Sequence, residues 1–360
     1  MNDNKDSNLE MNSRRRFLQQ ISLGAIGLKI GSRYQPARES SSGFSGATES
    51  RISFVTSKDQ REAAYQSLKP LEKEIENAIG NKQVVIKINL PHHEERFRTG
   101  ITDINFVRGI LDFLKPVYDR KVIIGEGVSQ SALSVFDGYK NFGFLQLEKE
   151  YNVQFIDTND QPTTRKFIKD EYQHPLGIHI INTYLDPNVF LISATRIKTH
   201  ESVIATLSLK NVVMGSPLNR YKQVDKKGMS DKPKMHSGGS KGLSYNLFSV
   251  ASMGVQPDLA VLDGVVGMEG NGPWGGTPIE QGVALASTDW LAADRIAVEL
   301  MGIDYNYLKY LQWCAEAGMG QDNLSKITII GKDYKPYVTK YKLPDNAAKS
   351  IEWIREDYKI

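Results

Sequence analysis

The chain has 360 residues, of which 40% are hydrophobic, so it can bury a sizeable core in two domains or in one large α/β unit. Its formal net charge of only +3 is too small for a protein that binds nucleic acid or another polyanion by charge alone. The single cysteine, Cys314, excludes an internal disulfide, a four-cysteine zinc site and a self-contained iron–sulfur cluster, and no apolar run is long enough to predict a transmembrane helix.

Residues 1–50 differ in composition from the rest of the chain. Residues 13–18 (SRRRFL) resemble a twin-arginine export motif, and a weakly apolar stretch and a Ser/Gly-rich linker follow. We therefore expect the twin-arginine export machinery as a partner and a periplasmic or otherwise exported location. A basic disordered tail is the alternative. No clear small-x-small cleavage site follows, so retention of the segment as a membrane anchor stays open.

From residue 51 onward the hydrophobic pattern alternates between strands and helices. Strands are predicted at 84–90, 121–126, 153–157, 178–183, 189–194, 259–263, 282–287 and 327–330. Helices are predicted at 105–117, 144–151, 243–253, 290–301 and 305–316, together with one that follows His200 and ends at Gly215. This alternation predicts an α/β fold with a mainly parallel sheet and helices on both faces, or two α/β lobes meeting at the site.

These elements predict an α/β domain over residues 51–335, with a site-bearing core at 84–302 and a C-terminal extension at 336–360. Ligands bind such sheets beyond the carboxyl ends of the strands. Polar residues gather there: Lys87 and Asn89 end one strand, and Lys198 and His200 follow another, each pair two residues apart and on one face.

The helix that follows is expected to carry Thr206 and Lys210 on one face, with Asn211 beside them. A cluster of lysine, histidine, threonine and asparagine donors suits a small anion or a metal-bound oxyanion. We predict that His200, Lys198 and Lys210 are catalytic, and that the ligand is bound by Lys87, Asn89, Thr206, Asn211 and Asn271.

Lys210 lies in an apolar helix and needs a counter-charge, which Asp263 or Glu126 could supply. Such a buried ion pair would hold two elements together without any role in binding. For Lys198 and His200 the alternative is a solvated strand end. These alternatives stay open at the level of the sequence.

Carboxylates near the strand ends suggest a second kind of site. Asp263, Glu269 and Asp289 could hold a divalent metal through oxygen ligands. Asp289 has a simpler explanation as the N-cap of the helix starting near Trp290, and Asp294 on that helix could pair with a lysine or arginine. We expect the glycine-rich segment 270–276 to line a pocket or to form a turn; Pro273 argues against a dinucleotide-binding loop.

Two further histidine-containing segments are less informative. His92 and His93, next to two glutamates, are predicted to be solvated. His236 lies in a Lys/Gly/Ser-rich loop that could cradle a phosphate or act as a lid. Cys314 is expected to be a core thiol in an amphipathic helix.

Several short motifs occur together in one order. They are KIN at 87–89, KTH at 198–200, Thr206, LKN at 209–211, Gly215, DG at 263–264, MEGNGP at 268–273, STD at 287–289 and AD at 293–294. In this combination the chain resembles the family known as domain of unknown function 362. The resemblance implies an α/β fold and a shared site, but no settled activity. Some members carry a ferredoxin-like module with cysteine-ligated clusters, and this chain lacks those cysteines.

The leading hypothesis is an exported enzyme that acts on a small anionic molecule, with His200 transferring a proton because its ordinary pKa lies near neutrality. In this hypothesis a divalent metal is an optional cofactor. The alternatives are a periplasmic binding or accessory protein without turnover, and a redox accessory that receives its cofactor from a partner.

Overall fold

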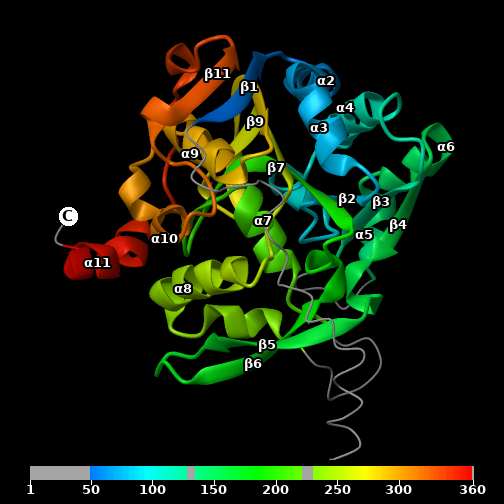
Figure 1. The fold of residues 1–360 in the computed structure, drawn as a ribbon. Coiled ribbons are helices and arrows are strands. Elements are labelled where there is room, and N and C mark those ends of the chain that lie inside the picture. The colour runs from blue at the N-terminus through cyan, green and yellow to red at the C-terminus, as the bar shows by residue number, and fades with distance from the viewer. Residues whose placement is uncertain (1–48, 128–133, 221–229, 359–360) are drawn as a thin grey trace, which may run out of the picture. The chain divides into compact units, whose positions relative to one another are not determined.

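The computed structural model of the protein describes residues 49–127, 134–220 and 230–358 (Figure 1). The segment that resembles a twin-arginine motif lies outside these residues. Within them, no helix combines the length and the apolar character needed to cross a membrane.

One mixed, mainly parallel sheet of nine strands forms the centre of the fold. Its order is β11-β1-β10-β9-β7-β2-β3-β4, and the short β8 pairs with β7. The strands are β1 (Ser50–Thr56), β2 (Gln83–Ile88), β3 (Val122–Glu126), β4 (Val153–Asp157), β7 (Val189–His200), β8 (Ile204–Thr206), β9 (Leu259–Asn271), β10 (Gly275–Ser287) and β11 (Ile327–Gly331). β10 pairs antiparallel with β1 and β9, and β8 pairs antiparallel with β7; the other pairs are parallel.

Helices cover both faces of this sheet, as the alternating pattern predicts. The helices are α2 (Gln60–Leu68), α3 (Glu72–Ile79), α4 (Ile104–Leu114), α5 (Val135–Asn141), α6 (Leu147–Glu150), α7 (Ser208–Gly215), α8 (Gly239–Ser252), α9 (Trp290–Leu300), α10 (Lys309–Glu316) and α11 (Ala347–Tyr358). The first five pack on one face and the last five on the other. The expectation of an α/β fold is confirmed, and the sheet is continuous and not split into two lobes.

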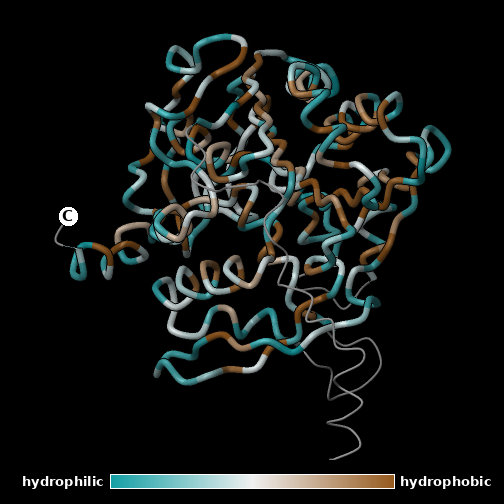
Figure 2. The backbone as a smooth tube through the Cα atoms, in the orientation of Figure 1, coloured by the Kyte–Doolittle hydropathy of each residue, from teal (hydrophilic) through white to brown (hydrophobic). Residues whose placement is uncertain are grey.

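Residue alternation along the central strands explains the two covered faces. On β2, Val84 and Ile86 belong to one hydrophobic cluster, and Val85 between them belongs to the other. Successive side chains of a strand point to opposite faces, so an all-apolar strand fills two cores at once. Figure 2 shows that helix α8, which covers one face of the sheet, contains both hydrophilic and hydrophobic residues along its turns.

The structure corrects several predicted elements. The strand predicted at 178–183 overlaps β6 (Pro175–Ile181), and its last two residues lie in the 3-10 helix Asn182–Tyr184. β6 pairs with β5 (Thr163–Lys169) in a separate two-stranded antiparallel sheet. Thr206 lies in β8 and not on the helix, whereas α7 ends at Gly215 as predicted. β7 continues beyond its apolar run because its polar end pairs with β8 and β9.

Regular structure also extends beyond the predicted end at Ile330. In the segment predicted as an extension, α11 places Ile351 and Ile354 in the same hydrophobic core as α8 and α9. Tyr341 joins this core and donates a hydrogen bond to Gln281 of β10. This segment therefore packs as part of the fold.

The start of α7 is held by a carboxylate from another helix. Its N-cap residue, Leu207, has no side chain that can accept a hydrogen bond. Asp294 of α9 supplies the acceptors: its Oδ1 accepts from the Ser208 amide at 2.8 Å and the Ser208 hydroxyl at 2.6 Å, and its Oδ2 accepts from the Leu209 amide at 3.0 Å. Asp294 thus binds backbone amides, not the lysine or arginine that was expected.

We predict that Asp294→Asn lowers the free energy of unfolding by about 1–3 kcal/mol, because the new amide group would face backbone donors that need an acceptor. Chemical denaturation with circular dichroism measures the change. Asp119→Asn, at an exposed aspartate, is the control and should leave the unfolding midpoint unchanged. Equal effects of the two substitutions would contradict this role of Asp294.

Candidate functional site

A cavity of about 600 Å³ lies beyond the carboxyl end of β2, alongside the extended end of β7. It is walled by β7 and β8, by α7, by the 3-10 helix Lys232–His236 and by the turn between β9 and β10. The polar and charged lining residues are Asn89, Lys198, His200, Glu201, Ser202, Thr206, Lys210, Asn211, Lys232 and His236, and the other lining residues are Pro91, Met214, Pro233, Pro273 and Trp274. Most of the predicted site residues therefore surround one cavity.

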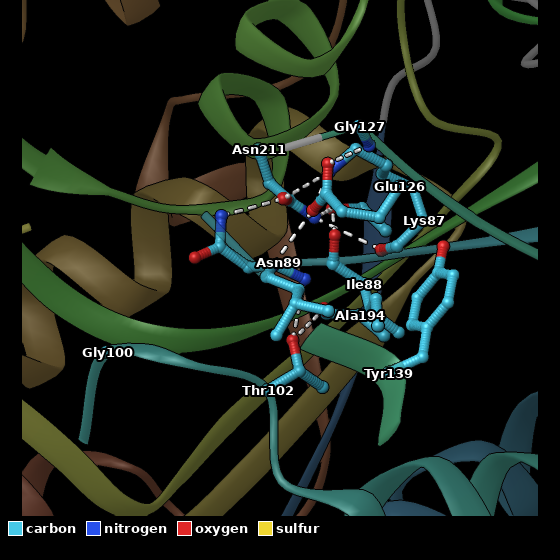
Figure 3. Close-up of polar contacts among 12 residues, drawn as sticks. Lys87, Ile88, Asn89, Gly100, Thr102, Glu126, Gly127, Tyr139, Ala194 and Asn211 are labelled. Atoms are coloured by element: carbon cyan, nitrogen blue, oxygen red, sulfur yellow. Dashed lines mark hydrogen bonds and ion pairs between the residues drawn. The ribbon is translucent and has the colours of Figure 1, made fainter. Parts of the chain in front are cut away.

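A buried ion pair joins the ends of β2 and β3 (Figure 3). The Lys87 ammonium at the end of β2 lies 2.7 Å from Glu126 Oε2 at the end of β3, and both side chains are at most 3% exposed. Glu126 also accepts from the Leu90 and Gly127 amides, each at 2.8 Å. Burial lowers the pKa of Lys87, and the adjacent Glu126 carboxylate opposes that shift.

Two asparagines extend the ion pair toward the cavity. Lys87 also donates to Asn211 Oδ1 at 3.2 Å, and the same oxygen accepts from Asn89 Nδ2 at 3.0 Å. Asn211 Nδ2 donates to the Lys87 carbonyl and to the Ser193 hydroxyl. Asn89 Oδ1 in turn accepts from Lys198 Nζ at 2.7 Å. The polar contacts Glu126–Lys87–Asn211–Asn89–Lys198 form a continuous relay.

Gly215 makes this arrangement sterically possible. A Cβ atom added at this position would lie 2.3 Å from Lys87 Cε, which is far inside van der Waals contact. The conformation of Gly215 is helical, so its role is the close approach of α7 to the Lys87 side chain and not a turn.

His200 is neutral in this environment. Burial, with the nearby Lys210, His236 and Lys198, lowers its pKa well below the usual range. Its Nδ1 accepts from the Ser202 amide at 3.0 Å, so the proton of the neutral ring resides on Nε2. The ordinary pKa that the sequence-based argument assumed does not hold for buried His200, and its role in proton transfer stays a prediction. In the neutral ring, Nε2–H is available as a hydrogen-bond donor.

Lys210 differs from the other buried lysines. It is 5% exposed, lines the cavity, and forms no hydrogen bond or ion pair with any residue in the described part of the chain. Burial and the neighbouring Lys232 lower its pKa to about 7, against a smaller opposing effect of Glu201. The Thr206 hydroxyl, which lines the same cavity, is also buried and has no partner among the described residues.

The counter-charges expected for Lys210 are engaged elsewhere. Glu126 pairs with Lys87, and Asp263 lies 3.8 Å from the Arg196 guanidinium. Burial raises the pKa of Asp263 to about 6. The expectation that either carboxylate neutralises Lys210 is therefore wrong.

The carboxylates predicted to hold a metal do not converge. Asp289 accepts from two amides at the start of α9 and from the Ser50 hydroxyl, which confirms its alternative role as N-cap. Glu269 accepts from the Lys342 amide at 2.7 Å, and Asp263 lies beside Arg196. In the residues that the structure describes, no group of three or more His, Cys, Asp or Glu side chains is placed to hold a metal ion.

Two predicted ligand-binding residues lie away from the cavity. Lys87 does not line the cavity and pairs with Glu126, and Asn271 pairs with Asp345 through two hydrogen bonds of 2.8 Å. Sequence reasoning missed Lys232, Glu201 and Trp274 as wall residues. The sequence KPKMH at 232–236 indicated a basic loop, but no feature of the nearby sequence indicated that this loop lines the same cavity as α7. The glycine-rich turn lines the pocket through Pro273 and Trp274, as expected.

His92 is not solvated, contrary to prediction. It is 9% exposed and its ring centroid lies 4.5 Å from those of both Phe97 and Trp274. Burial lowers its pKa. The ring therefore supports the Trp274 wall of the cavity from behind.

Comparison with known proteins gives one family match. The family model described as Domain of unknown function (DUF362) matches residues 84–299. The thylakoid-associated protein sll1697 of Synechocystis sp. is 26% identical over 165 residues, which make up 46% of this chain and 47% of that protein. The chain thus spans about half the length of this curated relative.

Two solved structures align loosely with the chain. A protein from Thermotoga maritima gives a TM-score of 0.32 at 11% identity, over 75% of this chain and 60% of that one. The lactate racemase apoprotein from Thermoanaerobacterium thermosaccharolyticum gives a TM-score of 0.38 at 12% identity, over 71% of this chain and 57% of that one. Both scores are too low for either structure to inform the site.

We predict that Lys87→Met lowers the free energy of unfolding by about 3–5 kcal/mol, because it leaves the Glu126 carboxylate buried without its counter-charge. Urea unfolding measures the loss. The control is Lys69→Met, which removes an exposed lysine paired with Glu72 and should cause little change. A small loss for Lys87→Met would show that the relay does not depend on the ion pair.

Proposed function

The chain belongs to the family described as Domain of unknown function (DUF362), a description that assigns no activity, and from its site we propose that it binds a small anionic molecule in the cavity beside α7. The observation that carries this proposal is the Lys210 amine. Lys210 lines the cavity, and its amine has no partner among the described residues, in surroundings that already contain the basic group of Lys232. A buried cation needs a counter-charge, and a bound anion would supply it.

The remaining lining residues suit the same ligand. Lys198 and Lys232 are two further amines; burial lowers the pKa of Lys198 well below its usual range and that of Lys232 to about 8, and a bound anion would favour their charged forms. Glu201 is the one acidic residue among the described lining residues. His200 Nε2 and the unpartnered Thr206 hydroxyl supply neutral donors. A volume of about 600 Å³ accommodates a small organic molecule, as ligand cavities of about 300–1,000 Å³ do.

One wall of the cavity is apolar, and this favours an organic anion over an inorganic one. Met214, Pro273 and Trp274 provide carbon surface next to the cationic wall. A carboxylate or phosphate group would bind at the lysines while its carbon skeleton covers this surface. The proposal includes no metal, because Asp263, Glu269 and Asp289 are each engaged by other groups of the protein.

The sequence analysis gave two hypotheses for such a site: an enzyme, and a binding or accessory protein without turnover. Both use the same cationic wall, and they differ in whether the ligand is chemically changed. Lys87 and Lys198 are held by hydrogen bonds within the protein, whereas the Lys210 amine has no partner among the described residues. We take this difference to favour an enzyme. The redox accessory has no support from the geometry of the described residues.

We also propose that the protein is exported, on the basis of residues 13–18. Replacing Arg14, Arg15 and Arg16 together with lysine keeps the positive charge but removes the arginine pattern. We expect the variant to accumulate in the cytoplasm, as measured by cell fractionation and immunoblotting in the native host. Unchanged secretion of the lysine variant would support the basic-tail alternative.

We predict that Lys210→Met weakens binding of small carboxylates or phosphates by about 10-fold to 100-fold, equivalent to about 1.4–2.8 kcal/mol. Without ligand, the same substitution should raise the free energy of unfolding by about 1–4 kcal/mol, because it removes a buried, unpaired amine. Isothermal titration calorimetry and thermal unfolding with pyruvate, oxalate and phosphate measure the two effects.

Lys73→Met, at an exposed lysine of α3, is the matched control and should change neither quantity. If the wild-type protein binds none of these anions, or if both variants bind them equally well, the proposed role of the cavity is wrong.

A further inference from the structure

Two buried lysines, Lys87 and Lys198, belong to the relay, and a third, Lys210, lies next to it; they make different contacts. Lys87 donates to Ile88, Glu126 and Asn211, and Lys198 lies within hydrogen-bond distance of Asn89 Oδ1, the Gly100 carbonyl and the Pro273 carbonyl. Three acceptors match the three hydrogens of an ammonium group, so both side chains are fixed.

Lys210 has none of these acceptors among the described residues, although it is buried to a similar extent. The residue lines a cavity that is large enough for an organic molecule. A lysine placed in this way has a free lone pair whenever it is deprotonated. Such desolvated lysines next to other cations are the ones that react with carbonyl groups.

The charge environment favours that deprotonated form. The titratable groups that line the cavity with Lys210, or act on it, are Lys198, His200 and Glu201 at the end of β7, and Lys232 and His236 on the facing 3-10 helix. Lys232 and burial lower the pKa of Lys210 to about 7, and Glu201 opposes them. At pH 7 the neutral fraction is then about a thousand-fold larger than for an ordinary lysine.

Building on the proposed anion site, we propose that Lys210 condenses with the carbonyl carbon of a small anionic oxo compound, such as a 2-oxo acid, to form an imine. The amine lone pair forms the new C–N bond, and the two amine hydrogens leave with the carbonyl oxygen as one molecule of water. The step involves no oxidation or reduction and needs no other reactant.

Other residues of the cavity fit this substrate class. The Lys232 side chain, which enters from the opposite element, can pair with the carboxylate. The Thr206 hydroxyl, unpartnered among the described residues, and His200 Nε2–H are donors suited to a carbonyl oxygen, which carries increasing negative charge as the amine attacks. The relay keeps Lys198 and Asn89 in place while Lys210 changes its bonding.

The experiment is reductive trapping of the full chain with pyruvate and sodium cyanoborohydride at pH 7. We expect one equivalent of adduct, with a mass gain equal to pyruvic acid less one oxygen atom, and peptide mapping should place it on Lys210. Acetone, which has the carbonyl group but no charge, should give at least 10-fold less adduct, and lactate should give none.

Lys210→Arg keeps a cation but cannot condense, and it should lose the adduct. Lys73→Arg, at an exposed lysine, should retain it. In the wild-type protein the trapping rate should rise with pH and reach half its maximum near pH 7, since only the neutral amine attacks. A simple surface lysine would reach half its maximum more than 3 pH units higher, near its ordinary pKa of about 10.4.

An adduct that maps to Lys232, Lys198 or scattered surface lysines overturns the inference. So does calorimetric binding of pyruvate without any adduct on Lys210, although the proposed anion site would stand in that case. If the wild-type protein binds none of pyruvate, oxalate and phosphate, both the imine at Lys210 and the proposed anion site are wrong. The adduct is mapped on the wild-type protein, so this result is obtained even if the Lys210→Arg variant fails to fold.

Discussion

The Lys87–Glu126 ion pair is the interaction on which the site depends. It joins the ends of two parallel strands and, through Asn211, fixes α7 against them. Removing two charges from water has a large desolvation cost, which is offset only when the remaining donors and acceptors are satisfied. Here each carboxylate oxygen of Glu126 and each hydrogen of the Lys87 ammonium has a partner. The polar groups of this ion pair are therefore all satisfied within the protein.

The relay also positions the unpaired lysine of the site, Lys210. Asn211 and its neighbour Lys210 lie on the same turn of α7, and the relay that anchors the asparagine also sets the direction of the lysine. Asp294 holds the start of the same helix from the other side. α7 is therefore fixed at its start and near its middle, and Lys210 lines the cavity together with other basic residues.

The outer walls of the cavity come from segments far apart in the sequence. β7 continues past its apolar core into the hairpin with β8, which places Thr206 opposite Lys198. The long hairpin of β9 and β10 supplies Pro273 and Trp274, and residues beyond 335 support it through hydrogen bonds of the Lys342 amide and Asp345. The C-terminal segment thus contributes to the site without lining it.

The sequence by itself determined the α/β class, the central apolar strands and the polar residues at their ends, because these follow from local periodicity and from the direction of parallel strands. It also placed Lys198, His200 and Lys210 in one neighbourhood. Only the tertiary structure decided that Lys87 is structural and Lys210 free, since each role depends on which carboxylate lies within reach across the sheet. The lowered pKa of His200 could not be predicted from the sequence either, because it results from burial and from basic groups that the fold brings close to the ring.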